Sequence, residues 1–154
     1  MKHLVVLLTS LTIPATVSQA GVNHTLDGIF ERYSEQYGVD SRYLKAICYV
    51  ESNLKVNALV KNDNGEASYG ICQVQLRTAR HMGFIHSKKE LMHPAYNIKY
   101  AAKYLAYNLR RYNGNYLKAI HAYNRGHYSP KREELNGYVK KVLLALLTIS
   151  ADNK

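Results

Sequence analysis

The chain contains no tryptophan and only two phenylalanines among its 154 residues, whereas tyrosine occurs 14 times. Any stacking of an aromatic ring against a ligand must therefore use tyrosine. Proline is also scarce, with three residues, and no internal repeat or low-complexity tract is visible. A hydrophobic fraction of 47% argues against disorder. Length and composition together favour one globular domain that is large enough to bury a core.

Patterns typical of metal, phosphate or nucleophilic chemistry are missing. The histidines are scattered, and His81, His86 and His93 lack a paired spacing such as His-Glu-x-x-His. No glycine-rich phosphate loop is present. A cysteine hydrolase would need a nucleophile and a base, and Cys72 and His121 are candidates for these roles. No local sequence signature supports such an enzyme. We therefore expect neither a metal nor another cofactor.

Acidic residues are few, with 11 Asp and Glu against 21 Lys and Arg, which gives a formal net charge of +10. Such a balance attracts polyanions. The basic residues form short clusters that are typical of solvated faces, and none belongs to a recognisable nucleic-acid module. We therefore expect a polyanionic partner other than nucleic acid.

The apolar run at the N-terminus is short. A basic start precedes Leu4 to Leu8, and residues 18–20 form a small-x-small cleavage site, a pattern typical of an export signal. Polar residues and Pro14 interrupt the apolar region, so a membrane anchor is the weaker alternative. We expect a signal peptide at 1–20, a mature domain at 21–154, a periplasmic or secreted location and no stable membrane insertion.

Only two cysteines occur, Cys48 and Cys72. In an exported domain, an even pair of cysteines suggests a disulfide. Two buried free thiols are the competing interpretation.

Apolar residues recur at helical spacing through most of the mature chain. Asp40 or Ser41 is a plausible N-cap, and Gly38 marks the end of the helix before it. The polar stretch 53–68, with its Asn64-Gly65 turn signal, is where short strands are expected. The segment 84–94 is expected to be a loop. These patterns predict a mainly α, compact bundle with little or no sheet, whose helices cover 26–37, 40–52, 75–82, 94–112, 116–123 and 135–149.

Glu51 lies on the apolar face of the second expected helix, at helical spacing from Leu44, Ile47 and Cys48. Loss of water disfavours a charged carboxylate, and in this way a protein keeps a glutamic acid protonated and able to donate a proton. Glu51 is therefore a general-acid candidate. The alternative is a partly exposed residue near the helix end, paired with an arginine or a loop amide.

Four short segments occur in a recognisable order: Glu51-Ser52, Gly70-Ile71-Cys72-Gln73, Asn97-Ile98 and Ala122-Tyr123-Asn124. This order resembles the soluble lytic transglycosylases, relatives of goose-type lysozyme that cleave bacterial peptidoglycan. In that family the catalytic acid sits in a Glu-Ser pair, a Gly-Leu-Met-Gln segment follows, and an Ala-Tyr-Asn segment closes the site. The resemblance extends from about Leu26 to about Tyr138.

Two features depart from the family pattern. Cys72 stands where methionine is usual, and the connection between Ser52 and Gly70 is long. The resemblance implies a lysozyme-like helical domain in which the Glu51 helix and the segment 70–73 lie together. The two sulfurs would then be within reach of each other.

The resemblance also implies the chemistry. One glutamic acid, here Glu51, protonates the bond between N-acetylmuramic acid and N-acetylglucosamine and then, as a base, takes a proton from the muramic C6 hydroxyl. A 1,6-anhydro product forms and no water is consumed. The residues implied to contact the sugar or the carboxyl group are Ser52, Tyr69, Gln73, Tyr123 and Asn124.

Each of these residues also has a structural interpretation. Ser52 would then only turn the chain after its helix, Gln73 would satisfy loop backbone, and Tyr123 would be a core tyrosine. Asn97 is expected to cap the long helix, and Asn124 to hold the turn that positions its neighbour.

Two other functions stay open. If Asp63 or Glu66 of the long connection approaches Glu51, the enzyme could be a hydrolytic muramidase, because a second carboxylate could act as base or nucleophile. Alternatively, Asp63 and Glu66 could both be charged residues of a turn that face the solvent. The other alternative is a non-catalytic cell-wall-binding protein.

The expected partner is the peptidoglycan glycan strand. Its peptide carboxylates are the polyanion that a basic exported protein would meet. The small size, without additional wall-binding modules, suggests a monomer that remodels the wall locally, for example for a secretion, pilus or conjugation apparatus.

Overall fold

The computed structural model describes residues 25–63, 65–130 and 137–151. The predicted signal peptide at 1–20 lies outside these residues. No helix in the described part of the chain is both long and apolar enough to cross a bilayer.

The fold is mainly helical with one small sheet, as predicted. The helices are α1 (Leu26–Tyr37), α2 (Ser41–Ser52), α3 (Leu76–His81), α4 (Lys88–Leu91), α5 (Pro94–Arg111), α6 (Tyr116–Arg125) and α7 (Gly137–Ala151). The strands are β1 (Leu59–Asp63), β2 (Glu66–Tyr69) and β3 (Val74–Gln75), which pair antiparallel in the order β1-β2-β3. The first two strands lie largely in the polar stretch where strands were expected.

The first two helices begin and end where their sequences indicate. Thr25 caps α1, and Gly38 ends it in the left-handed conformation with φ 65°. The side chain of Asp40 accepts a hydrogen bond from the backbone N–H of Arg42 and so caps α2. Side-chain acceptors of this kind satisfy the unpaired N–H groups of a first helical turn.

One expected segment was wrong. The segment 84–94 is not all loop, because Ser87 and Glu90 form a reciprocal capping box that starts the short helix α4. Helix α6 extends two residues beyond Tyr123, to Arg125, and Gly126 ends it with φ 78°.

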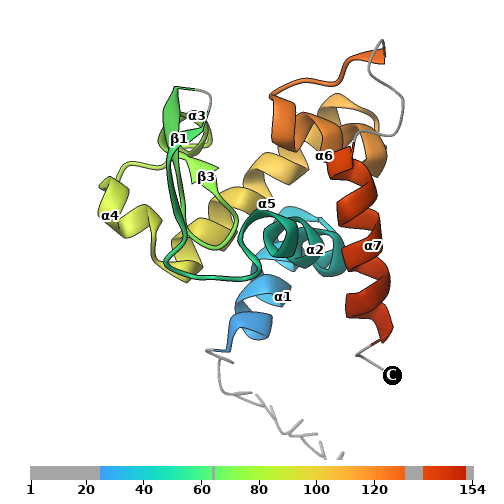
Figure 1. The fold of residues 1–154 in the computed structure, drawn as a ribbon, viewed down its shortest axis with the longest axis horizontal. Coiled ribbons are helices and arrows are strands. Elements are labelled where there is room, and N and C mark those ends of the chain that lie inside the picture. Colours follow the sequence, from blue (N-terminus) through green and yellow to red (C-terminus); the bar gives the residue numbers. More distant parts are fainter. Residues whose placement is uncertain (1–24, 64, 131–136, 152–154) are drawn as a thin grey trace, which may run out of the picture.

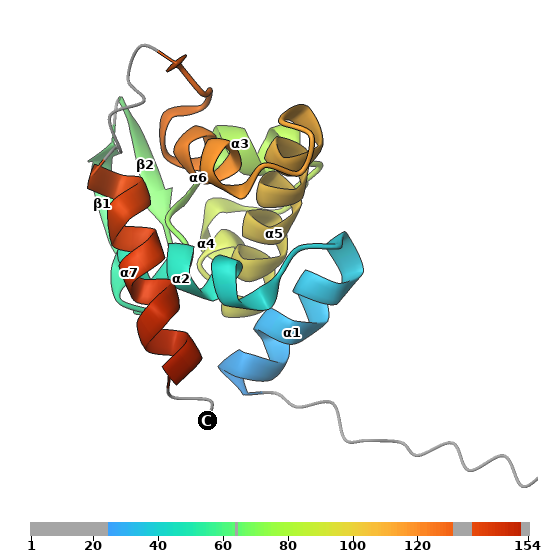
Figure 2. The same ribbon diagram turned by 90° about the vertical axis from the view of Figure 1, so that its right-hand side faces the viewer.

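Helix α5 runs through the middle of the molecule and separates two sides (Figure 1). The sheet, α3 and α4 lie on one side, while α6 and α7 lie on the other. Helix α2 packs against α7 and α1, and the view turned by 90° shows α7 lying across α2 (Figure 2). The core between these elements is fully buried at Leu44, Ile47, Ile98, Leu105 and Ile120.

The turn between β2 and β3, residues 69–73, is held by side chains from three helices. Asn97 of α5 is fully buried; its Nδ2 donates to the carbonyls of Tyr69 (2.7 Å) and Leu91 (2.9 Å), and its Oδ1 accepts from the N–H of Cys72 (2.8 Å). Asn97 is therefore structural, but it does not cap α5, which starts at Pro94 after His93.

The same turn brings its backbone unusually close to α5. Gly70 has φ 71°, and a Cβ atom there would lie 2.6 Å from Nδ2 of Asn97. Since real Cβ atoms do not approach other heavy atoms so closely, only glycine fits this position without moving the asparagine.

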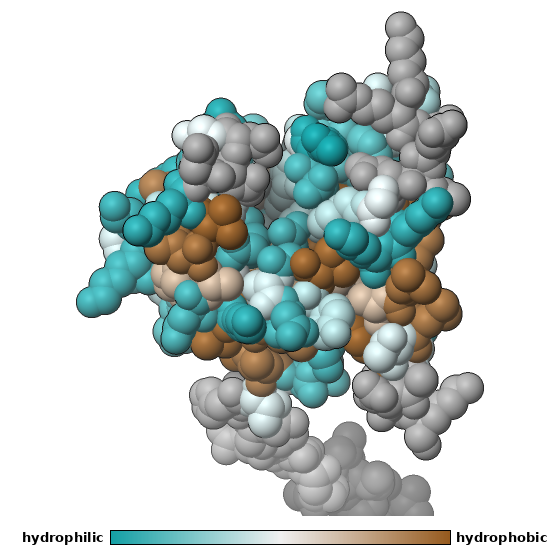
Figure 3. All heavy atoms as spheres, viewed as in Figure 1, coloured by the Kyte–Doolittle hydropathy of each residue, from teal (hydrophilic) through white to brown (hydrophobic). Residues whose placement is uncertain are grey.

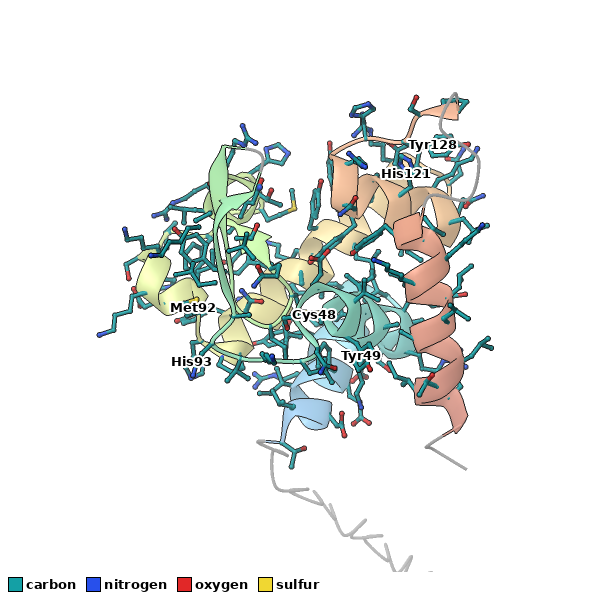
Figure 4. The ribbon with its side chains drawn as sticks, viewed as in Figure 1. Cys48, Tyr49, Met92, His93, His121 and Tyr128 are labelled. Carbon is teal, nitrogen blue, oxygen red and sulfur yellow. A yellow bond between two sulfur atoms is a disulfide. The ribbon has the colours of Figure 1, made fainter. Side chains whose placement is uncertain are left out.

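A disulfide joins Cys48 of α2 to Cys72 of the turn, which confirms the predicted pairing over that of two free thiols. Both residues are fully buried, and Cys48 lies in the centre of the molecule (Figure 4). The helix that carries Glu51 is thus covalently tied to the turn that carries Gln73.

We predict that Asn97→Ala lowers the free energy of unfolding by about 3 kcal/mol, because three backbone groups, two of them in buried hydrogen bonds, lose their partner. Urea denaturation followed by circular dichroism measures this. Asn57→Ala, at an exposed position, is the control and should cost less than about 0.5 kcal/mol. Equal stability of the two variants would contradict the role given to Asn97.

We also predict that the Cys48→Ala/Cys72→Ala variant is less stable than the oxidised protein by about 3 kcal/mol, since the bridge closes a loop with a sequence separation of 24 residues. The measurement is urea denaturation of the oxidised protein, the reduced protein and the variant. The reduced protein and the variant should agree with each other, and no effect of reductant on the wild type would contradict the prediction.

Candidate active site

A groove with a volume of about 790 Å³ lies between the two sides of the molecule. Its described lining comes from the end of α2, the segment 73–81, the second half of α5, and the region from His121 to Ser129. Figure 3 shows the surface hollowed between the sheet side and the α6 side, with hydrophilic residues around the opening. Glu51 is the only carboxylate among the described residues that line this groove.

Glu51 is half-buried near the end of α2, and one of its oxygens is held by a residue far away in the sequence. The hydroxyl of Tyr138, on α7, donates to Oε1 of Glu51 over 2.6 Å. Because α7 packs along α2, this hydrogen bond fixes the direction in which the carboxyl group points.

The environment of Glu51 keeps the neighbouring phenols protonated. Burial, followed by the negative charge of Glu51, raises the pKa of Tyr138 well above its usual value. The same two causes raise the pKa of Tyr123 well above its usual value. Both phenols are therefore hydrogen-bond donors at neutral pH, and the proton in the short Tyr138–Glu51 bond belongs to the tyrosine.

Gln73 lines the groove in a backbone conformation that is rare for residues other than glycine, with φ 48°. Its Nε2 donates to the carbonyl of Gly70 over 2.8 Å, which fixes the amide orientation. Its Oε1 is buried and has no hydrogen-bond partner among the residues that the structure describes. A buried acceptor without a partner is costly, and this one belongs to a residue of the groove wall.

Tyr123 and Asn124 reach the groove from the end of α6. The hydroxyl of Tyr123 donates to the carbonyl of Cys72 over 3.1 Å, and its ring lies 5.3 Å from that of Tyr104. Tyr123 therefore connects α6 to the disulfide turn beside Glu51. Asn124 is exposed at the edge of the groove.

Ser52 and Tyr69 do not belong to the described groove lining. Ser52 donates to the carbonyl of Ile71 over 2.7 Å and so ties the end of α2 to the turn. The carbonyl of Tyr69 accepts from Asn97. In the structure, both residues hold the turn that carries Gln73.

The two candidate second carboxylates are placed differently. Oε1 of Glu66 accepts from the backbone N–H of Arg77 (2.9 Å), and Oε2 lies 3.6 Å from Nε of the same arginine. Glu66 is not part of the described groove lining. Asp63 ends β1, and its side chain lies outside what the structure describes.

The loop that follows α6 forms one wall of the groove. Since a carbonyl can only accept, Nδ1 of His121 donates to the carbonyl of His127 over 3.3 Å. The N–H of Tyr128 donates to the hydroxyl of Tyr112 over 2.8 Å. His121 and Tyr128 lie beside each other here (Figure 4), with ring centroids 5.5 Å apart. Among the described residues, no group of three or more His, Cys, Asp or Glu is arranged to hold a metal ion.

Tyr138 was not among the site residues predicted from the sequence. Tyr138 falls within the last expected helix, 135–149, and no family motif includes it. A buried phenol needs a hydrogen-bond partner, and Glu51 is a carboxylate on another apolar helix face. A tyrosine and a carboxylate on two apolar helix faces were the available signal for this pair. Periodicity, however, does not show that α7 and α2 pack together.

Residues 28–142 match the transglycosylase SLT domain family. The protein IpgF of Shigella flexneri is 32% identical over 128 residues, which cover 81% of this chain and 83% of IpgF. IpgF of Shigella sonnei matches to the same extent.

Solved structures have the same fold. One is an inactive glutamate-to-glutamine mutant of the lytic transglycosylase Slt from Pseudomonas aeruginosa, with a TM-score of 0.69, 23% identity and 86% of this chain covered. Another is the 70-kDa soluble lytic transglycosylase of Escherichia coli, with a TM-score of 0.62, 25% identity and 77% of this chain covered. The chain spans about a quarter of the length of each, 24% and 23%. The lysozyme-like fold is confirmed, and the match over residues 28–142 shows that the chain belongs to the transglycosylase SLT domain family.

Proposed function

We propose that this chain is a peptidoglycan lytic transglycosylase in which Glu51 is the sole catalytic acid and base. The observation that carries the proposal is the groove of a transglycosylase-family domain in which Glu51 is the one carboxylate among the described lining residues. Most glycosidases need two carboxylates. A single carboxylate suits a reaction in which the substrate supplies its own nucleophile.

In the first step, Glu51 donates its proton to the oxygen that joins N-acetylmuramic acid to N-acetylglucosamine. The glycosidic bond breaks, the N-acetylglucosamine leaves with the proton, and the muramic N-acetyl group stabilises the positive centre at C1. Glu51 is now a carboxylate. It takes the proton of the muramic C6 hydroxyl while O6 bonds to C1, which gives the 1,6-anhydro product and restores the acid.

The neighbours of Glu51 have defined roles in this scheme. Tyr138 donates to Oε1 and so keeps the direction of the carboxyl group fixed through both proton transfers. Oε1 of Gln73 is a buried acceptor without a partner in the described part of the chain, and it accepts a hydrogen bond from the sugar. Tyr123 and Asn124 contact the sugar at the groove edge, while Ser52 and Tyr69 contribute by holding the 69–73 turn.

The cellular setting is also part of the proposal. The export pattern at residues 1–20 and the disulfide between Cys48 and Cys72 both suit an oxidising compartment outside the cytoplasm, where peptidoglycan is found. We place the mature enzyme there as a monomer that opens the wall locally, for a secretion, pilus or conjugation apparatus.

We predict that the mature protein releases anhydro-muropeptides from peptidoglycan sacculi and that Glu51→Gln lowers the rate about a thousandfold, because the general acid is lost. Mass spectrometry of the soluble products measures both. Glu66→Gln is the control carboxylate and should keep activity within about threefold. Reducing-end muropeptides would instead support the muramidase alternative, and Asp63→Asn and Glu66→Gln would then identify its second carboxylate. Absence of product from the wild type would favour the wall-binding alternative.

We further predict that Tyr138→Phe lowers kcat by about tenfold to a hundredfold with little change in KM. It removes a hydrogen bond to a charged group but no contact with bound sugar. Steady-state turnover of soluble muropeptide chains gives both constants. Tyr33→Phe, a half-buried tyrosine of α1 remote from the groove, is the control. A rise in KM with unchanged kcat would contradict this role for Tyr138.

A further inference from the structure

The outer face of helix α7 carries apolar side chains that the core does not use. The inner face packs on α2 and α6, and its residues Val139, Val142 and Ala145 are buried. On the opposite face, Leu144 is 64% exposed and Leu147 is 68% exposed. Helix α7 lies at the edge of the molecule (Figure 1), so these two leucines point away from the rest of the domain.

Two lysines lie at the start of the same surface. Lys140 precedes the leucines at positions i, i+4 and i+7 of one helical face, and Lys141 is its neighbour. Both lysines are exposed, and no other residue of α7 is charged. No carboxylate within residues 25–63, 65–130 and 137–151 pairs with either of them. Figure 3 shows hydrophobic atoms exposed over α7, next to a group of hydrophilic atoms.

This combination differs from an ordinary solvated helix face. A single exposed leucine is common on protein surfaces, but the water-facing side of a surface helix usually carries polar and charged residues. Apolar side chains beside lysines, on one face of a helix, are typical of helices that lie in the interface of a bilayer. The apolar side chains enter the boundary of the acyl chains, while the lysines attract anionic headgroups.

The size of the surface favours lipid over a protein partner. A stable protein interface buries roughly 800 Å² on each partner, which takes about 20–30 residues. Two leucines and two lysines are too few for the centre of such an interface. A lipid surface needs no complementary shape, and it also attracts the whole molecule, whose formal net charge is +10.

We propose that the outer face of α7, formed by Lys140, Lys141, Leu144 and Leu147, is a peripheral binding surface for membranes that contain anionic lipid. The helix would lie in the plane of the interface and would not cross the bilayer. No residue of α7 is part of the described groove lining, so the groove stays open when this face is bound. The inference goes beyond the proposed function and does not depend on it, because membrane binding requires no turnover.

Vesicle sedimentation tests the proposal. The mature protein is mixed with vesicles of equal parts phosphatidylglycerol and phosphatidylcholine, or with vesicles of phosphatidylcholine alone. We expect the partition coefficient to be about tenfold higher for the anionic vesicles at low salt and to fall as the salt concentration rises.

Variants separate the α7 face from the net charge. Leu144→Ser/Leu147→Ser and Lys140→Gln/Lys141→Gln should each lower the partition coefficient for anionic vesicles about tenfold. Lys88→Gln/Lys89→Gln is the matched control, because it removes the same charge from exposed positions of α4 on the other side of the molecule. This control should lower the partition coefficient by less than about threefold. Circular dichroism verifies that each variant is folded.

Fluorescence identifies the face that meets the lipid. The chain contains no tryptophan, so a single introduced indole reports only its own surroundings. The emission of the Leu147→Trp variant should shift to shorter wavelength on anionic vesicles, because the indole leaves water. The Ile85→Trp variant, at a position that is 81% exposed on the sheet side, should show no shift.

Three results would overturn the proposal. Absence of binding to anionic vesicles would reject the membrane and leave a protein as the partner of this face. Equal losses in the two lysine variants would show that only the net charge acts. An unchanged emission of the Leu147→Trp variant on vesicles that bind the protein would show that another face meets the lipid.

Discussion

The attachment of the 69–73 turn to its neighbours is the constraint on which the rest of the site depends. A disulfide joins the turn to α2, Asn97 of α5 bonds to its backbone at two places, and Tyr123 of α6 bonds to it at a third. Gln73 is held in a left-handed conformation at the end of this turn. Because such strain persists only where the surroundings enforce it, the attachments keep Gln73 and Glu51 on one groove wall.

The Tyr138–Glu51 hydrogen bond brings the C-terminal helix into the site. A carboxyl group that must donate and then accept a proton has to keep its direction through both steps. Tyr138 provides this from α7, and its raised pKa, which results from burial and from the charge of Glu51, keeps it a donor. In the proposed mechanism, the packing of α7 on α2 therefore serves catalysis as well as stability.

Most of the fold followed from the sequence, and so did four of the residues that line the groove. Periodicity and caps located the long helices, and ordered motifs led to Glu51, Gln73, Tyr123 and Asn124, which line the groove together. Local patterns do not show which distant helices pack, so the role of Tyr138 was missed. They also do not distinguish a side chain that faces the groove from one that holds the turn, as the hydrogen bond from Ser52 to Ile71 illustrates.

The central claim is that a single carboxylate is sufficient because the nucleophile is the muramic C6 hydroxyl. The most direct measurement is digestion of sacculi in water enriched in oxygen-18, followed by mass spectrometry of the newly formed muramic ends. An intramolecular attack predicts anhydro ends that carry no label from the solvent. Incorporation of labelled oxygen at the muramic C1 would show that water is the nucleophile and would contradict the account.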